Sequence, residues 1–251
     1  MSSISPFFFE NSPLEKLATQ KHKTYIEASP FPHIIIDNFL PEDIANQILN
    51  DFPDPGDIDW IVRPKDHKFQ QNKLKNYNEE LMGPSMRHIL SQFNSSIFIC
   101  FLERLTGIEG LIPDPHFWGG GMHLIERGGF LKIQVDFNWH ERLKLDRRLN
   151  LLFFLNKEWK ESYGGCLEFW NRDVSRCEKK LPPIFNRCVI FNASSFSYHG
   201  HPDPLNCPQN RYRKSLAIYY YANGKQESES SEKHRTTYKL RPGESPFIEK
   251  A

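Results

Sequence analysis

Apolar residues recur at helical spacing in the first half of the chain. Between Pro41 and Phe52 they keep to one face of a pattern that opens with a proline and two acids, and Pro53 ends it. A second pattern of the same kind starts at Ser85 and ends at Gly107. We therefore expect two helices in this half, each with an apolar face packed on a sheet.

The segments around these two helices have different patterns. Residues 1–30 are polar and carry several lysines, and we expect them to form a helix or a strap over the body. Residues 31–37 place three consecutive isoleucines between a proline and an aspartate, which indicates a buried strand. Residues 53–80 are rich in Pro, Asp, Lys and Asn and show no period, which predicts a long loop. Such a loop either walls a substrate cleft or is a surface excursion.

From Pro113 onward the chain consists of short apolar or alternating segments separated by Gly, Pro and Asn. Several short strands at near-regular spacing predict a mainly β fold with flanking helices, whose core is a β-sandwich or jelly roll. We expect one structural domain in three parts. These are an N-terminal strand with helices (residues 1–112), the β core (113–222) and a polar, mobile C-terminal tail (223–251).

Polar residues on two of the predicted strands are candidates for the site. On a strand, alternate side chains share a face, so Gln134 and Asp136 point the same way. The strand at 148–156 is nearly all apolar, with Asn150 on the face of Leu152 and Phe154. A buried amide needs partners, so we expect this face to line a cavity.

Composition excludes several classes of protein. Lysine plus arginine (32) nearly balances aspartate plus glutamate (31), so no nucleic-acid or polybasic membrane partner is indicated. The five cysteines include no CxxC pair, which argues against a disulfide framework and a structural zinc site. The apolar run at residues 7–9 has no basic region before it and is too short for a signal peptide or a membrane span. We expect a soluble, cytoplasmic protein.

One group of residues has the chemistry of a non-haem iron site. The carboxylate of Asp136 is followed at long range by the imidazole of His199, and then by Arg213 and Ser215. A facial triad also has a histidine two residues before the aspartate, and that position holds Gln134. His201 lies two residues after His199, so spacing alone does not choose between these two histidines.

Several motifs together resemble those of one enzyme family. They occur in the expected order over most of residues 31–222, and the likeness rests on no single motif. The chain resembles the prolyl 4-hydroxylase-type branch of the 2-oxoglutarate- and Fe(II)-dependent dioxygenases. The motifs are residues 128–133, 136–138, 147–150, 154–156 with Trp159, 163–168, 199–202 and 213–217.

The resemblance implies a double-stranded β-helix that binds Fe(II) and 2-oxoglutarate. Asp136 and His199 would be metal ligands, while Arg213 and Ser215 would hold the far carboxylate of 2-oxoglutarate. The reaction would hydroxylate an aliphatic C–H bond of an amino-acid, peptide or small-metabolite substrate, with succinate and CO2 as co-products. Similar enzymes often need ascorbate.

Two departures from the family pattern affect this expectation. Phe154 stands where a tyrosine is common, which leaves more of 2-oxoglutarate binding to Arg213, Ser215 and Asn150. An amide oxygen of Gln134 is a poorer iron ligand than an imidazole nitrogen. Three outcomes follow. Gln134 is a weak third ligand; His123, or His140 in an exposed turn, supplies the nitrogen instead; or the chain is a non-catalytic relative that binds a ligand or a partner.

Overall fold

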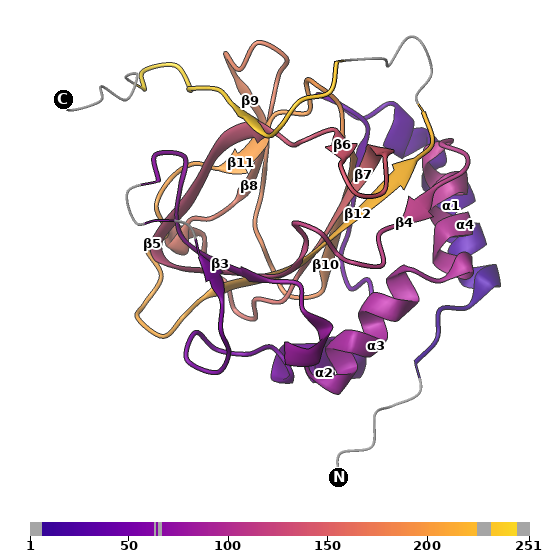
Figure 1. The fold of residues 1–251 in the computed structure, drawn as a ribbon, viewed down its shortest axis with the longest axis horizontal. Helices are drawn as coiled ribbons and strands as arrows, with labels where there is room; N and C mark the ends of the chain where they lie inside the picture. Colours follow the sequence, from indigo (N-terminus) through magenta and orange to yellow (C-terminus); the bar gives the residue numbers. More distant parts are fainter. Residues whose placement is uncertain (1–6, 63, 65–66, 225–231, 245–251) are drawn as a thin grey trace.

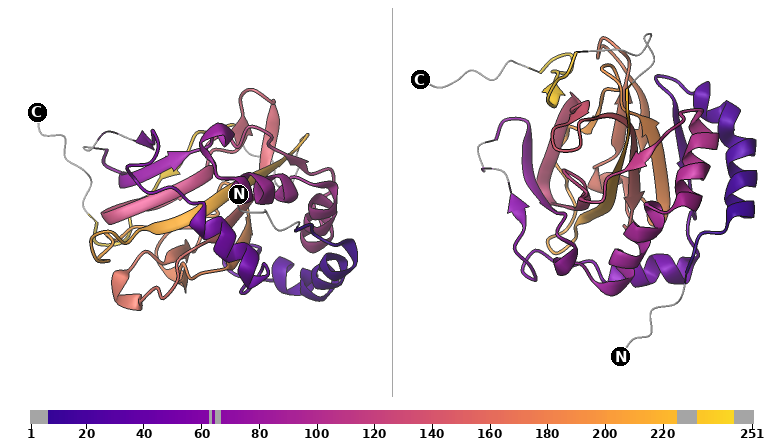
Figure 2. Two further views of the ribbon diagram at one scale, coloured as in Figure 1. Left: turned by 90° about the horizontal axis from the view of Figure 1, so that it is seen from below. Right: turned by 45° about the vertical axis from the view of Figure 1, so that its right-hand side comes forward.

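The computed structural model describes residues 7–62, 64, 67–224 and 232–244. Its main feature is one antiparallel sheet that curls around an interior, with the helices packed along one side (Figures 1 and 2). This arrangement confirms the predicted mainly β fold with a jelly-roll core. Within the described residues, no helix is long and apolar enough to cross a membrane.

The path of the sheet brings the sequence-distant parts of the site together. The long strands β7 and β5 both pair with β12, and β11 pairs with the other end of β5. The strands on this path, in order, are β1 (His33–Ile36), β10 (Arg187–Asn192), β7 (Leu145–Phe154), β12 (Arg213–Ala222), β5 (Gly121–Val135), β11 (His199–His201), β8 (Leu167–Trp170) and β9 (Cys177–Leu181).

The helices cover the outer side of this sheet. Their apolar faces share one core with outward-facing side chains of β7, β10 and β12, including Phe153, Ile190 and Ile218. Burying such side chains contributes about 1.5–3 kcal/mol each, so this face fixes the helices in place. The helices are α1 (Asn11–Ile26), α2 (Glu42–Asn50), α3 (Pro84–Phe93) and α4 (Ser96–Thr106), with short 3-10 turns at η1 (Glu79–Leu81) and η2 (Glu161–Tyr163).

The helix predicted from Ser85 to Gly107 is two helices. The break falls at Asn94 and Ser95, and the Ser95 hydroxyl accepts a hydrogen bond from the backbone N–H of Phe98 at 3.3 Å. This is the usual way a serine begins a new helix. Apolar spacing alone missed the break because α3 and α4 bury their faces in the same core.

The prediction of an unstructured loop at residues 53–80 was wrong in part. This stretch contains β2 (Ile61–Val62) and β3 (Gln70–Asn76), and β3 pairs with β5. A bulge at Asn72, whose φ is 48°, separates the two halves of this pairing. The strand was missed because it is polar, with only its last residues buried.

The end of the chain is part of the fold where it is described. β13 (Thr237–Tyr238) pairs with β5 at Val135 and Gln134. Asn138 holds the approach to this strand, since its amide donates to the Glu232 carbonyl and accepts from the His234 N–H, both at 2.8 Å. Residues 232–244 are therefore not a mobile tail, while residues 225–231 and 245–251 lie outside the described part. The remaining strands are β4 (Ile112–Pro113) and β6 (Trp139–His140).

Candidate active site

Asp136 lies directly after β5, and polar groups surround its carboxylate. Gln134 Nε2 donates to Oδ1 at 2.7 Å, while Arg147 Nη2 and Asn150 Nδ2 donate to Oδ2 at 2.9 and 3.0 Å. Burial acts to raise the pKa of Asp136, but the positive charge of Arg147 holds the pKa well below its ordinary value. The residue is a carboxylate at neutral pH. Gln134 and Asp136 share a face, as the alternation predicted.

His199 meets this carboxylate from the neighbouring strand. It lies opposite Gln134 in the β11–β5 pairing, and its Nε2 is 3.4 Å from Asp136 Oδ2. Its Nδ1 is 2.9 Å from the Ser197 carbonyl oxygen. A carbonyl oxygen only accepts hydrogen bonds, so Nδ1 carries a hydrogen and a neutral ring directs its Nε2 lone pair at the carboxylate. Two electron-pair donors that face each other suit a cation placed next to both.

Gln134 has one polar atom without a partner. Its Nε2 is used by Asp136, but its Oε1 is buried and accepts no hydrogen bond from the residues that the structure describes. A buried carbonyl-type oxygen without a partner costs about 1–3 kcal/mol. An oxygen of this kind, next to a carboxylate and an imidazole, is available to a bound cation.

Neither alternative histidine completes a set of strong ligands. His140 was expected in an exposed turn but is 2% exposed on β6. Its Nε2 lies 3.4 Å from Asp114 Oδ2, and its ring contacts Trp118 and Tyr221. Its burial follows from these ring contacts and from the pairing of β6 with β7.

His123 is closer to the site. It lines the inner cavity together with Asp136 and His199. Burial, followed by the charges of Lys73 and Lys75, lowers the pKa of His123 well below its ordinary value. Across the described residues, however, no group of three or more His, Cys, Asp and Glu side chains has the arrangement to hold a metal ion.

Arg213 and Ser215 lie deeper, on β12, and both are buried. Arg213 Nε donates to the Gly165 carbonyl at 2.7 Å, and its guanidinium lies 4.9 Å over the Phe154 ring. Gly165 allows this approach, because a Cβ there would be 3.1 Å from Arg213 Cδ. Burial lowers the pKa of Arg213 to about 10, so it is still a cation at neutral pH.

The buried guanidinium of Arg213 has no carboxylate in ion-pair contact within the described part of the chain. A buried charge without a counter-ion is costly, which makes an anionic ligand the natural partner of Arg213. Arg213, Ser215, Asn150, Asp136 and His199 all line one inner cavity of about 60 Å³. The expected convergence of carboxylate, imidazole and guanidinium is therefore present in the structure.

No role for Arg147 follows from the sequence pattern, although this residue has a central position. It is 1% exposed, and its guanidinium lies between the rings of Phe137 and Tyr219, at 4.5 and 3.4 Å from their centroids. It donates to both Asp136 and Asn150 Oδ1. The available signal was a pair of arginines, Arg147 and Arg148, directly before a mainly apolar run. Asn150 uses its amide on Arg147 and Asp136, and its predicted contact with 2-oxoglutarate stays a prediction.

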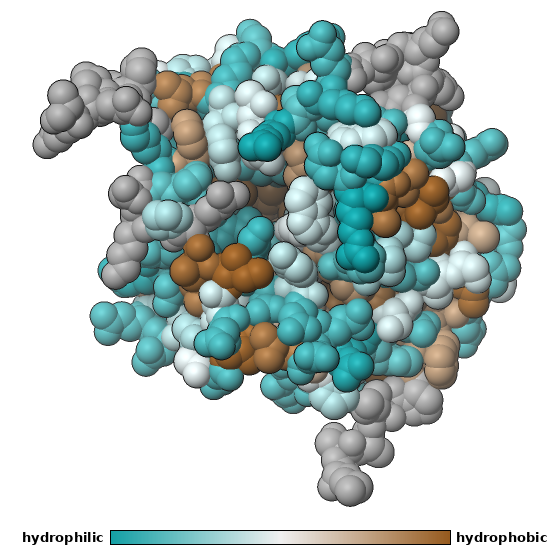
Figure 3. Space-filling view, in the orientation of Figure 1, coloured by the Kyte–Doolittle hydropathy of each residue, from teal (hydrophilic) through white to brown (hydrophobic). Residues whose placement is uncertain are grey.

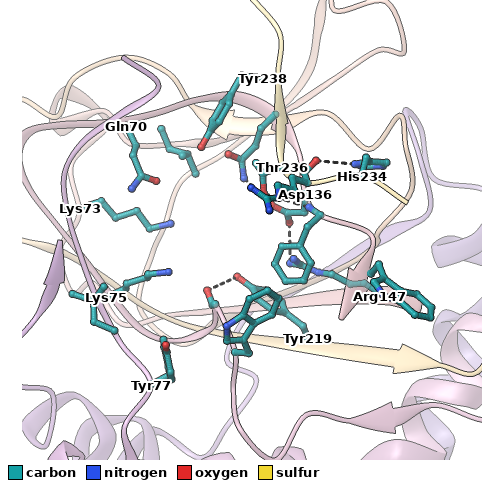
Figure 4. A pocket seen from close by; sticks show the side chains of 18 of the residues that line it. Gln70, Lys73, Lys75, Tyr77, Asp136, Arg147, Tyr219, His234, Thr236 and Tyr238 are labelled. Atoms are coloured by element: carbon teal, nitrogen blue, oxygen red, sulfur yellow. Dashed lines mark hydrogen bonds and ion pairs between the residues drawn. The ribbon is translucent and has the colours of Figure 1, made fainter. Parts of the chain in front are cut away.

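A wider cleft opens above the inner cavity, with a volume of about 810 Å³. Asp136 and Gln134 form part of its floor, and side chains from β3 and the C-terminal segment form two of its walls (Figure 4). In the space-filling view the surrounding face is mainly hydrophilic and is hollowed near its centre (Figure 3). The volume lies within the 300–1,000 Å³ range of small-molecule sites.

Comparison with known proteins gives one family and several similar folds. The model of the 2OG-Fe(II) oxygenase superfamily matches residues 120–221. A prolyl-4-hydroxylase from Pseudomonas putida superposes with a TM-score of 0.54 at 16% identity, over 82% of this chain and 100% of that chain. A prolyl hydroxylase from Trichoplax adhaerens, solved with a hypoxia inducible factor peptide, gives 0.57 at 15% identity, over 84% and 91%.

A third similar structure was solved with small molecules bound. HygX from Streptomyces hygroscopicus, with nickel, 2-oxoglutarate and hygromycin B bound, has a TM-score of 0.54 at 8% identity, over 81% of this chain and 87% of that chain. At these identities the three structures establish the fold of this chain.

Proposed function

Because residues 120–221 of this chain match the model of the 2OG-Fe(II) oxygenase superfamily, we propose that the protein is an Fe(II)- and 2-oxoglutarate-dependent dioxygenase. Its substrate would be an amino-acid, peptide or small-metabolite compound hydroxylated at an aliphatic C–H bond. One observation carries the proposal. Asp136 and His199 meet 3.4 Å apart in the same cavity that contains the buried guanidinium of Arg213.

The residues present fit an iron ion held by two strong ligands and one weak one. Asp136 would supply a carboxylate oxygen, His199 its Nε2 and Gln134 its unpartnered Oε1. Imidazole and carboxylate are both suited to non-haem Fe(II), and an amide oxygen is a weaker ligand than the imidazole it replaces. We therefore expect the ion to bind less tightly than in a site with two histidines.

The remaining residues would bind and orient the co-substrate. Arg213 would hold the far carboxylate of 2-oxoglutarate through its planar fork, with Ser215 adding a hydroxyl hydrogen bond. Apolar side chains of the inner cavity, among them Leu152 and Phe191, would exclude water from this interaction. Phe154 has no hydroxyl for the co-substrate, but its ring supports the Arg213 guanidinium.

When iron is bound, it would supply the oxidation, in which O2, 2-oxoglutarate and a C–H bond become succinate, CO2 and a C–OH group. The protein's part is to fix the ligand atoms. The Ser197 carbonyl keeps a hydrogen on His199 Nδ1, so that Nε2 stays an electron-pair donor. Asn150 and Arg147 hold the plane of the Asp136 carboxylate. A need for ascorbate and a cytoplasmic location stay predictions.

The proposal is tested by an anaerobic Fe(II) titration with 2-oxoglutarate, followed by admission of oxygen. We expect a weak metal-to-ligand charge-transfer band and then succinate. Gln134→His should raise both iron affinity and succinate formation. Removing a group that supports a metal ligand already costs about tenfold or more in metal affinity, so restoring an imidazole ligand should raise iron affinity by at least about tenfold. Gln71→His is a matched control, because this β3 residue lies outside the cavity lining.

A second function is favoured by the contacts of Asp136. Its Oδ2, the oxygen that faces His199, already accepts hydrogen bonds from Arg147 and Asn150. A fixed guanidinium therefore supplies positive charge beside the metal position. If the chain is a non-catalytic binding protein, 2-oxoglutarate should bind equally well with and without Fe(II), and no succinate should form. Gln134→His should then change neither measurement.

A further inference from the structure

We propose that the cleft above the metal position accepts a small substrate that carries an anionic group, a phosphate or a carboxylate, bound by Lys73 and Lys75. This inference rests on the proposed function in treating the bound molecule as a substrate. It concerns the 810 Å³ cleft, and not the inner cavity in which Arg213 would hold 2-oxoglutarate.

The geometry of β3 directs both lysines into the cleft. Lys73 and Lys75 are two residues apart on one strand, so they share a face, while Leu74 between them points to the core. The bulge at Asn72 shifts the register of β3 against β5 and so determines which of its side chains face the cleft. Figure 4 shows the two side chains extending into the cavity from the same wall, toward the side that holds Asp136 and Arg147.

Among the described residues that line the cleft, basic side chains outnumber acidic ones, although the two kinds nearly balance over the whole chain. Both acids of this lining have a cation nearby: Asp136 pairs with Arg147 at 2.9 Å, and Glu141 lies 3.6 Å from Lys144 outside the cleft. The described lining therefore carries more positive than negative charge. Its basic residues are Lys73, Lys75, Arg147, Lys233 and Arg235.

Lys73 also borders the metal position, because it lines the inner cavity together with Asp136 and His199. Lys73 lines both the cleft and the inner cavity, so it lies at the passage between them. An anionic group held by Lys73 would place the rest of the substrate within reach of Asp136 and His199.

Aromatic residues give the cleft a second kind of wall. Trp118 is 40% exposed on its rim, and the Trp139 ring carries the Lys233 ammonium at 3.4 Å from its centroid. Tyr238 stacks on Phe69 with ring centroids 4.3 Å apart. Flat rings suit a compact molecule with a ring or an apolar body. The neighbouring lysines suit a charged end on that molecule, because lysine binds phosphate and carboxylate as a point charge.

The test uses the full chain, with and without saturating 2-oxoglutarate, and isothermal titration with matched pairs of small molecules. One pair is glucose 6-phosphate and glucose. The other is an N-acetylated hydrophobic amino acid, which has a free carboxylate, and its neutral C-terminal amide. We expect the anionic member of at least one pair to bind at least tenfold more tightly, and the pair that responds identifies phosphate or carboxylate. Lys73→Met and Lys75→Met should each weaken that binding about tenfold, as expected for loss of one charge-assisted hydrogen bond.

Lys23→Met is the matched control, because it removes the same charge from an exposed position on α1. Equal binding of anionic and neutral members, or no effect of either cleft variant, would overturn the inference. So would a loss of 2-oxoglutarate affinity in Lys73→Met, which would assign Lys73 to the co-substrate, or tighter binding of an acidic peptide than of any small molecule. If the wild type prefers anionic members but does not bind 2-oxoglutarate, the proposed function fails and the anion site stands.

Discussion

The Nε2 of His199 lies 3.4 Å from Oδ2 of Asp136, while Nδ1 of the same ring contacts the Ser197 carbonyl at 2.9 Å. The contact with Ser197 fixes the hydrogen on Nδ1, so in the neutral ring Nε2 faces Asp136 with its lone pair. A proton or a metal ion between the two side chains relieves this opposition. The pair is therefore prepared for a cation before any ion binds.

Arg147→Met should destabilise the metal-free protein by about 3 kcal/mol, because it leaves the partly buried Asp136 carboxylate without its counter-ion. Addition of Zn(II) should restore part of this loss by taking the place of the guanidinium charge. Urea unfolding with and without Zn(II) measures both effects. Arg148→Met is the control, since Arg148 contacts the Gly224 carbonyl and should show no dependence of stability on Zn(II). Equal Zn(II) effects in the two variants would show that Arg147 does not compete with metal.

Arg213→Lys should weaken 2-oxoglutarate binding about thirtyfold, since one charge-assisted hydrogen bond of the bidentate pair is worth about 2 kcal/mol and lysine lacks the planar fork. Isothermal titration of 2-oxoglutarate measures the change. Lys214→Met, on the other face of β12, should leave the affinity within twofold. An unchanged affinity in Arg213→Lys would mean that the dicarboxylate is held elsewhere.

His33 should make stability depend on pH. Its burial, partly offset by the contact of Nδ1 with the Phe31 carbonyl, lowers its pKa from the ordinary 6.5. A group with a lowered pKa in the folded state contributes stability that is complete above the unfolded pKa and is lost as pH falls through the folded pKa. The free energy of unfolding should therefore decrease below about pH 6.5, and less steeply in His33→Asn. His116 is exposed, so His116→Asn is the matched control. If the stability of the two variants depends equally on pH, His33 is not the source of the pH dependence.

Asn138→Ala should release the C-terminal segment from the cleft. The change removes the hydrogen bonds to Glu232 and His234, each worth about 1 kcal/mol. Limited trypsin digestion followed by mass spectrometry should show faster cleavage after Arg235 and Lys239 than in the wild type. Asn171→Ala, in the turn between β8 and β9, is the control. Cleavage at the wild-type rate would show that the β13–β5 pairing alone holds the segment.

The sequence predicted the features that depend on local pattern and on motif order. Four such features follow from spacing and are present in the structure. They are the strand at 31–37, the helix predicted between Pro41 and Phe52 (α2), the jelly-roll core, and the common face of Gln134 and Asp136. The metal and co-substrate roles of Asp136, His199, Gln134, Arg213, Ser215 and Asn150 stay predictions.

What the sequence did not predict depends on contacts between distant residues. β3 has a polar sequence, and only pairing with β5 makes it a strand. His140 looks exposed in its turn and is buried by rings that come from elsewhere in the chain, including Tyr221. Arg147 is an ordinary charged residue in the sequence, and its position between Phe137 and Tyr219 exists only after the sheet has curled.

Both edges of β5 are paired, and the strands on its two edges have different parts in the candidate site and the cleft. One margin of β5 pairs with β12 and β11, which carry Arg213, Ser215 and His199 of the candidate site, while β3 and β13 pair with the opposite margin. No long unpaired margin of β5 is therefore left to recruit another chain into aggregates. Substitutions in β3 and β13 can therefore change which molecules enter the cleft without disturbing the candidate site residues on β11 and β12, and engineering of new selectivity is best begun there.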